Sequence, residues 1–221
     1  MINVINIEKL GKKYKEKVIF NDFCISVGEN EFVSIIGKSG QGKSTLLNII
    51  GMLDNDYEGS YFFDNRDVRK TSQSMQARLR NKKLGFIFQN YNLLEDLNVI
   101  DNIYLPYCFC DSKIDKEKKQ YICEMIKKLQ IEDLSKQKVK FLSGGEKQRV
   151  AIARALALNP KVILADEPTG NLDKQNTKVV LDLLFKMREM GKSIIMVTHD
   201  LSIIDKCDKV IDLSKGAIYD I

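Results

Sequence analysis

A glycine-rich segment followed by a lysine and a serine carries the strongest chemical signal in the sequence. Residues 37–44 have the sequence GKSGQGKS, which matches the pattern G-x-x-x-x-G-K-[ST]. Its glycines allow backbone N–H groups to turn inward around a phosphate, and the helix expected to begin near Lys43 adds the positive end of its dipole. Lys43 would reach the β- and γ-phosphates, and the Ser44 hydroxyl would bind Mg²⁺. The segment predicts a nucleoside triphosphate site rather than a plain glycine-rich turn.

Two acidic residues follow a second apolar run. The expected strand 162–165 ends directly in Asp166 and Glu167. Acidic groups at the carboxyl end of a parallel strand lie where ligands bind, so Asp166 is expected to hold Mg²⁺ through water. Neighbouring strand residues point to opposite sides, which lets Glu167 face the γ-phosphate and polarise an attacking water. The alternative is that Glu167 only caps the next turn.

A serine and two glycines open a third candidate site. Ser143, Gly144 and Gly145 precede a segment that has no proline until Pro160. This predicts a second helix N-terminus able to bind an anion, about a hundred residues beyond the first. The alternative is an ordinary capping box between Ser143 and Glu146. A capping box needs no paired glycines, which cost a helix about 1 kcal/mol each, so the pattern indicates a close approach to this backbone.

The elements that must position these residues alternate between strand and helix at both ends of the chain. Strands are expected at 2–7, 18–27, 31–36, 162–165 and 193–197, and helices at 44–53 and between the last two strands. This order predicts an α/β fold with a parallel sheet and an antiparallel edge unit at the N-terminus. Residues 91–158 contain no convincing strand. Helical spacing at 121–129 and an alanine-rich helix at about 146–158 predict a helical sub-lobe there.

Composition sets broad limits on the class of protein. With 221 residues, 44% hydrophobic and 29% charged, the chain fits one soluble globular domain and excludes collagen-like and disordered classes. No apolar run is long enough for a membrane span, and the N-terminus lacks a signal peptide, so a cytosolic chain is expected. Five scattered cysteines and a single histidine, His199, argue against zinc, and reduced, mostly buried thiols are expected. The net charge of +5 suits nucleic acid, an anionic membrane or a phosphate ligand without choosing among them.

These motifs together resemble the ATP-binding cassette (ABC) ATPase family over nearly the whole chain, and Leu142-Ser143-Gly144-Gly145 is similar to its signature motif. The resemblance implies one ABC ATPase domain over 1–221 with a P-loop NTPase (RecA-like) core. That core would comprise about 1–90 and 159–221, include the antiparallel unit, and carry an inserted helical subdomain at about 91–158. ATP and Mg²⁺ are the implied ligand and cofactor.

The resemblance also assigns roles to single residues. Tyr14 would stack on adenine, Gln89 would contact Mg²⁺ and the attacking water, and His199 would contact the γ-phosphate. Residues 171–173, Asn-Leu-Asp, would cross a dimer interface. The alternatives are an exposed strand-end tyrosine, a plain loop glutamine and a structural histidine.

The expected site has three sets of residues. The catalytic set is Lys43, Gln89, Glu167 and His199. The metal set is Ser44, Gln89 and Asp166. The nucleotide-binding set is Tyr14, Gly37, Lys38, Ser39, Gly40, Gln41, Gly42, Lys43, Ser44, Thr45, Ser143, Gly144, Gly145 and Asp173.

Three residues differ from those that are most frequent at the same positions of the family's motifs. Lys38 and Gln41 stand where Pro and Ser are frequent, and both are expected to contribute backbone rather than side chain. Glu146 stands where Gln is common, which places a carboxylate near the signature turn.

The resemblance implies a mechanism based on a dimer. Two copies would bind head to tail in the ATP-bound state, each ATP lying between the phosphate loop of one chain and Ser143–Gly145 of the other. A separate transmembrane permease would hold the chain at the inner face of the membrane. Its contact would follow Gln89, among Tyr91, Leu93, Leu94, Leu97, Val99 and Ile100. The alternative for those residues is the core of the helical lobe.

Residues 48–51 and 169–173 most resemble the branch of lipoprotein releasers, macrolide exporters and antimicrobial-peptide exporters or resistance pumps. An exporter's ATPase subunit, without nucleic acid as a partner, is therefore expected. The alternatives are an ABC-type ATPase acting on ribosomes or DNA, favoured by the charge, and a small-molecule phosphoryl transferase, which would need no signature turn. The basic stretch 70–83 is expected to form a solvated helical face.

Overall fold

The computed structural model of the chain describes residues 3–110 and 114–221. Its first sheet is antiparallel, has the strand order β2-β1-β4-β5, and contains β1 (Asn3–Tyr14), β2 (Lys17–Gly28), β4 (Glu58–Phe63) and β5 (Arg66–Asp67). The sequence predicts a strand only at 2–7, whereas β1 continues to Tyr14. The register of β1 against β2 shifts around Leu10, and Lys9 has a positive φ of 50°. These irregularities interrupt the alternation that would have revealed the second half of the strand.

The second sheet positions the site. Its strand order is β10-β9-β3-β8-β7-β6, and all neighbours are parallel except β10 and β9. Its strands are β3 (Phe32–Ile36), β6 (Leu84–Ile87), β7 (Val162–Asp166), β8 (Ser193–Val197), β9 (Lys209–Asp212) and β10 (Ala217–Asp220). The predicted strands at 31–36, 162–165 and 193–197 are confirmed as the central β3, β7 and β8. Their apolar runs are buried because both faces of the sheet are covered.

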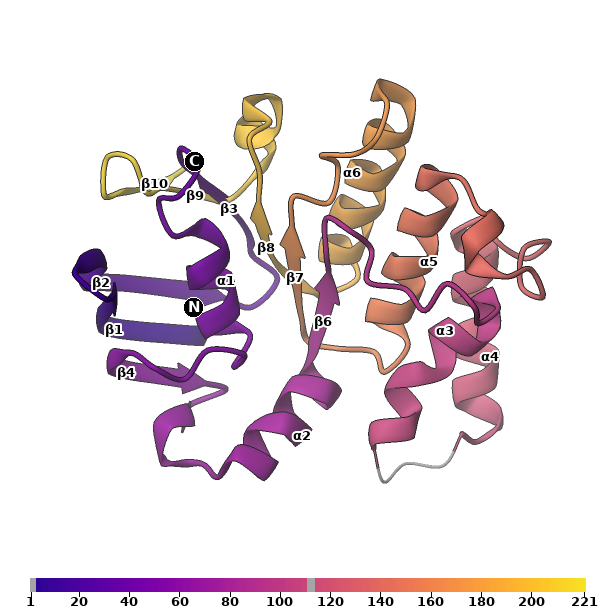
Figure 1. Cartoon of the computed structure of the whole chain (residues 1–221), viewed down its shortest axis with the longest axis horizontal. Helices are drawn as coiled ribbons and strands as arrows, with labels where there is room; N and C mark the ends of the chain where they lie inside the picture. The colour runs from indigo at the N-terminus through magenta and orange to yellow at the C-terminus, as the bar shows by residue number, and fades with distance from the viewer. Residues whose placement is uncertain (1–2, 111–113) are drawn as a thin grey trace.

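Helices lie on both sides of this sheet. The α-helices are α1 (Lys43–Ile50), α2 (Gln73–Lys83), α3 (Val99–Tyr104), α4 (Lys116–Lys128), α5 (Gly144–Leu156) and α6 (Lys174–Glu189). Figure 1 shows the antiparallel sheet and α1 on the left and α3, α4 and α5 on the right, with β6, β7 and β8 between them. Among the described residues of 91–158 there is no strand, only an isolated bridge between Asn98 and Lys138.

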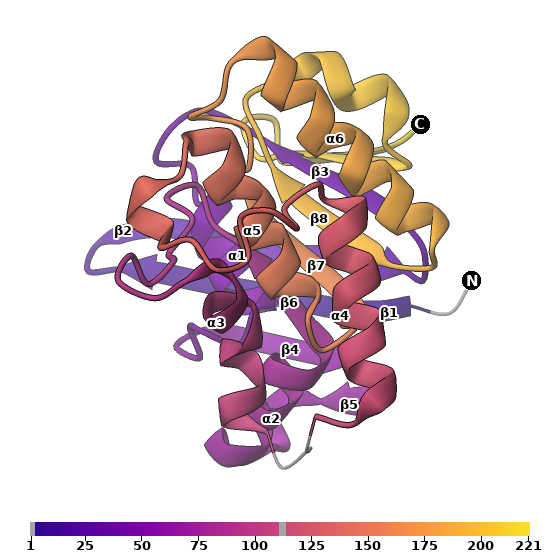
Figure 2. The ribbon, with the colours of Figure 1, turned by 90° about the vertical axis from the view of Figure 1, so that its right-hand side faces the viewer.

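Two apolar cores lie on the two faces of the six-stranded sheet. Strand β7 sends Ile163 and Ala165 to the core shared with α3 to α6, and Val162 and Leu164 to the core shared with α1 and the antiparallel sheet. Figure 2 shows α4 and α5 in front of the strands, on the first of these faces. Because successive strand residues alternate in this way, the groups at the strand ends also point to opposite sides.

The cysteines differ from the sequence-based expectation of mostly buried thiols. Cys207 is buried, whereas Cys24, Cys108 and Cys123 are exposed and Cys110 is intermediate. Burial raises the pKa of Cys207 to about 12. The described residues include no helix that is both long and apolar enough to cross a membrane.

Candidate nucleotide-binding and catalytic site

Strands β3, β8 and β7 are parallel neighbours, so the residues at their carboxyl ends meet at one edge of the sheet. The structure brings together Lys43 and Ser44 after β3, Asp166 and Glu167 at the end of β7, and His199 after β8. The Ser44 hydroxyl donates to Asp166 Oδ1 across 3.3 Å, and His199 Nε2 lies 2.6 Å from Glu167 Oε1. Five residues that the sequence singled out therefore share one site.

The phosphate loop depends on backbone conformations that favour glycine. Gly37, Gly40 and Gly42 have φ values of 152°, 76° and 94°. Gly42 also lies against β2, since a Cβ there would be 2.4 Å from Ile19 Cγ2. The close packing against β2 and the positive φ thus both require a glycine at this position.

Lys43 holds the loop from inside. Its side chain is buried, and its Nζ donates to the backbone oxygens of Gly37, at 2.9 Å, and Lys38, at 3.2 Å. Gln41 contributes its side chain, contrary to the expectation that it supplies only backbone. Its Oε1 accepts a hydrogen bond from the Lys38 N–H at 2.5 Å.

Asp166 is suited to a cation. Burial raises the pKa of its carboxyl group, and the charge of Glu167 adds to this rise, while the hydrogen bond from Ser44 and the charge of Lys43 oppose it. A divalent ion would offset the cost of burying this carboxylate, and the Ser44 hydroxyl beside it is the kind of oxygen ligand that Mg²⁺ takes. The described residues hold no group of three or more His, Cys, Asp or Glu side chains able to bind a metal. Ser44 and Asp166 are therefore suitable ligands for a Mg²⁺ ion whose other ligands would come from nucleotide and water.

Glu167 occupies a strained position at the turn after β7. Its φ is 45°, in the left-handed region, which costs a residue other than glycine about 1–2 kcal/mol. The Glu167 N–H donates to Val197 O at 3.0 Å, which ties the turn to β8. Its carboxylate contacts His199, whose side chain is 54% exposed. Strain of this kind persists where the surrounding structure enforces it.

Gln89 follows β6, next to β7 in the sheet. The Asn171 side chain donates to the Gln89 backbone oxygen at 3.1 Å, and a Cβ on Gly170 would lie 3.2 Å from Gln89 Nε2. The structure thus places Gln89 against the loop that follows Glu167. Its contact with metal or water remains a prediction.

The turn Ser143–Gly145 forms a capping box, which is the alternative interpretation of this sequence pattern. The Glu146 N–H donates to Ser143 Oγ at 3.4 Å, and the Ser143 N–H donates to Glu146 Oε2 at 2.7 Å. Hydrogen bonds from Ser143 hold the pKa of Glu146 below its usual value. Gly145 is explained within the chain, because a Cβ there would lie 2.5 Å from Asn176 Oδ1 on α6.

This turn lies outside the cluster at the sheet edge. It begins α5, and Figure 1 shows α5 and α1 on opposite sides of β6 and β7. Asp173 is the N-cap of α6 and accepts from the Asn176 N–H at 2.8 Å, a bond that lowers the pKa of Asp173. Within one chain Asp173 therefore caps the N-terminus of α6. Its position in a dimer interface remains a prediction.

Tyr14 is held by two residues that sequence reasoning missed. It is 49% exposed, its hydroxyl donates to Asp54 Oδ2 at 3.2 Å, and Lys12 Nζ lies 4.8 Å from its ring centroid. Lys12 is buried and pairs with Asp54 at 2.9 Å. Burial acts to lower the pKa of Lys12, but its hydrogen bonds to Asp54 and Asp56 outweigh this and raise it. The sequence signals this contact only through Lys12, a lysine on the inward face of β1, and Lys12 lies beyond the strand expected at 2–7.

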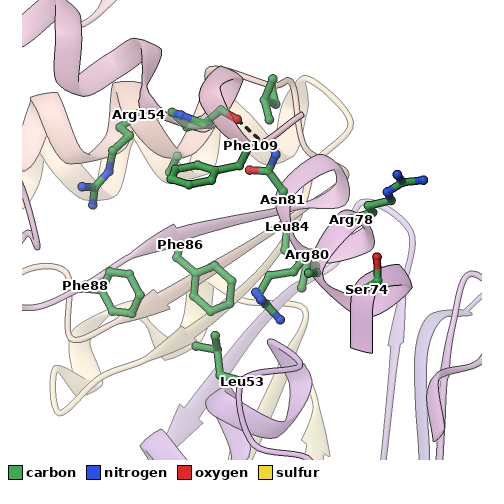
Figure 3. Close-up of a pocket in the computed structure, with 14 residues that line it drawn as sticks. Leu53, Ser74, Arg78, Arg80, Asn81, Leu84, Phe86, Phe88, Phe109 and Arg154 are labelled. Carbon is green, nitrogen blue, oxygen red and sulfur yellow. Dashed lines mark hydrogen bonds between the residues drawn. The ribbon is translucent and has the colours of Figure 1, made fainter. Parts of the chain in front are cut away.

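A cavity of about 560 Å³ lies at the β6 edge of the six-stranded sheet, between α2, β6, α5 and the short helix Leu105–Phe109. Figure 3 shows the aromatic rings of Phe86, Phe88 and Phe109 and the guanidinium group of Arg80 around it, while the Arg78 side chain, which also lines the cavity, extends away from these rings. The basic stretch 70–83 is mostly exposed, as expected of a solvated helical face, and Gln76 is the buried residue of α2. Arg80 in addition donates to Met52 O at 2.9 Å.

The apolar residues expected after Gln89 to meet a permease divide between core and surface. Val99 is buried in the core of the helical lobe, and Leu93 and Ile100 pack against it. Leu94 is 50% exposed. The alternative weighed for this segment, a core of the lobe, therefore holds for Val99 and in part for its neighbours.

Comparison with known proteins gives one consistent result. The family model described as "ABC transporter" matches residues 20–170. The lipoprotein-releasing system ATP-binding protein LolD of Aquifex aeolicus is 41% identical, over 99% of this chain and 97% of its own length. The macrolide export ATP-binding/permease protein MacB of Campylobacter jejuni is 41% identical over 97% of this chain, which spans only 33% of that relative's length.

A solved structure supports the same assignment. An ATP-binding cassette in a dimeric, post-hydrolysis state bound to ADP and Pi is 36% identical, with a TM-score of 0.87 and 98% coverage of both chains. The expected cassette fold, with its antiparallel N-terminal sheet, its mostly parallel second sheet and its helices, is thereby confirmed. The chain therefore belongs to the ABC transporter family and is an ABC-type ATPase, the ATP-binding subunit of a transporter.

Proposed function

We propose that the chain drives export of a lipoprotein, peptide or antimicrobial compound by hydrolysing ATP as a dimer bound to a separate membrane permease. The names of the relatives LolD and MacB support the exporter branch. The observation that carries the chemistry is the single cluster formed by Lys43, Ser44, Asp166, Glu167 and His199. The alternative of an ATPase acting on ribosomes or DNA has no such support among these relatives.

Each group in the cluster has a role that its position allows. Lys43 and the inward N–H groups of the loop bind the phosphates. Ser44 and Asp166 hold Mg²⁺, which when bound neutralises phosphate charge. Glu167 accepts a proton from the attacking water, and His199 orients the Glu167 carboxylate and contacts the γ-phosphate.

The position of the signature turn favours a dimer. Ser143–Gly145 opens α5, away from the phosphate loop of the same chain, so a second copy would supply this turn to the nucleotide. The similar cassette with ADP and Pi is dimeric. Adenine would stack on Tyr14, and the loop that ends at Asp173 would lie at the interface between the copies.

The cavity in Figure 3 is the proposed contact with the permease, which would hold the chain at the cytoplasmic face of the membrane. Phe109 is 75% exposed and Leu53 is 48% exposed at its rim, and Arg78 and Arg80 add positive charge. An intracellular helix of the permease with apolar and acidic side chains would complement this surface.

Two measurements test the proposal. Mg²⁺-dependent ATP hydrolysis should be lost in Lys43→Ala and retained in Lys119→Ala, a control on the exposed face of α4. Tagged Glu167→Gln with ATP should recover a multi-span membrane protein from detergent-solubilised cells, and a further Phe109→Glu change should reduce that recovery. Recovery of ribosomal or DNA-repair proteins alone would contradict the transport role while leaving the ATPase chemistry intact.

A further inference from the structure

The peptide group that joins Gly37 to Lys38 is held from both of its sides. Its carbonyl oxygen accepts from Lys43 Nζ at 2.9 Å, and its N–H donates to Gln41 Oε1 at 2.5 Å. The Gln41 N–H in turn faces the Lys38 carbonyl oxygen at 3.4 Å. Residues 38 and 41 therefore bond to each other reciprocally across one turn of the loop.

The Gln41 amide lies close against the backbone. A Cβ on Gly37, whose φ is 152°, would lie only 2.7 Å from Gln41 Oε1. Gln41 is also partly buried. A similar bond, with a side chain accepting from the N–H three residues earlier, joins Glu146 to Ser143 at 2.7 Å in the signature turn.

Nucleotide binding would act on only one of the two supports. Lys43 Nζ, which contacts the Gly37 and Lys38 oxygens at 2.9 and 3.2 Å, would have to share its three N–H donors with the phosphates. The bond to Gln41 does not compete with the nucleotide and can persist. It keeps the Gly37–Lys38 peptide from rotating and so keeps the neighbouring N–H groups directed inward. An amide also accepts this bond without adding negative charge next to the phosphates.

On this basis we infer that Gln41 is a positioning residue, whose side chain maintains the phosphate-binding shape of the loop through its bond to the Lys38 N–H while Lys43 engages the nucleotide. The inference rests on the proposed binding of nucleotide phosphates by residues 37–44. The bond requires an acceptor in the side chain of residue 41 and an N–H at residue 38, which a proline there would lack.

The test is a double-mutant cycle on ADP binding with Gln41→Met, which keeps the side-chain length but removes the acceptor, and Lys38→Pro, which removes the donor. Loss of one neutral hydrogen bond should raise the Kd for ADP about three- to tenfold in Gln41→Met. In the Lys38→Pro background the same change should have no effect on Kd. The KM for ATP should rise while kcat at saturating ATP stays within about twofold.

Two further measurements separate positioning from loss of structure. The amide proton of Lys38 should lose its hydrogen-bonded chemical shift in Gln41→Met while the thermal midpoint stays at the wild-type value. An unchanged Kd in Gln41→Met, or an equal rise in both backgrounds, would overturn the inference. If Lys43→Ala binds ADP as the wild type does, the phosphate site itself is misassigned, which is a different failure.

Discussion

His199 Nε2 lies 2.6 Å from Glu167 Oε1, and the two side chains come from the ends of the neighbouring strands β8 and β7. The Glu167 N–H also bonds to Val197 O at 3.0 Å, so backbone and side chain tie the two strand ends together. The carboxylate is thereby directed by a neighbour rather than left free in solvent. Glu167 and His199 should act as one unit in catalysis.

Replacement of the proposed base tests this directly. Glu167→Gln keeps the shape of the side chain but removes the proton acceptor, so kcat for ATP hydrolysis should fall about 10²- to 10⁴-fold. The variant protein should then accumulate as an ATP-bound dimer, which size-exclusion chromatography would detect. Glu189→Gln, at the exposed end of α6, is the matched control. Hydrolysis by Glu167→Gln at the wild-type rate would disprove the assignment of the base.

The coupling of the two residues predicts that their effects do not add. His199→Ala should lower kcat about 10²-fold, because Glu167 loses the contact that orients it. In the double variant with Glu167→Gln the added loss should be small, since groups that act as a unit are non-additive. Steady-state kinetics on the four proteins measures this. Full additivity would show that the contact in the structure has no catalytic role.

The buried lysine beside Tyr14 gives a stability prediction. Asp54→Ala leaves the Lys12 ammonium, 3% exposed, without its closest carboxylate and should lower the free energy of unfolding by about 3 kcal/mol. Asp56 also contacts Lys12, at 3.2 Å, but its side chain is 95% exposed. Asp56→Ala should therefore cost less than about 1 kcal/mol. Urea unfolding compares the two variants, and equal losses would contradict the role given to burial.

The capping box of α5 predicts a dependence on pH. Hydrogen bonds from Ser143 lower the pKa of Glu146 in the folded chain. At pH values between the folded and the unfolded pKa, the unfolded chain therefore binds more protons than the folded chain. The stabilising contribution is complete above the unfolded value, about 4.3, and is lost as pH falls through the lower folded pKa. Urea unfolding at several pH values should show the wild type's advantage over Glu146→Gln shrinking with acidity. An advantage independent of pH would rule out the ionised carboxylate as its source.

How much the sequence predicts depends on the range of the interaction. The phosphate loop, the acidic pair and the strands β3, β7 and β8 follow from local patterns, because a buried parallel strand and a glycine-rich turn each leave a compact signature. The second half of β1 and the strands β4, β5, β9 and β10 fall outside the strands expected from the sequence. Their register shifts, short lengths and mixed composition give no regular period.

The sequence by itself determined which chemical groups this protein carries and the order of the elements that hold them. Only the tertiary structure decided that His199 contacts Glu167 and that Lys12 and Asp54 contact Tyr14. It also decided that the Gln41 side chain accepts a hydrogen bond from the Lys38 N–H. It also separated the Ser143–Gly145 turn from the phosphate loop. Local propensity is encoded by neighbours along the chain, whereas these contacts depend on strand order and register, which bring distant residues together only when the whole sheet is packed.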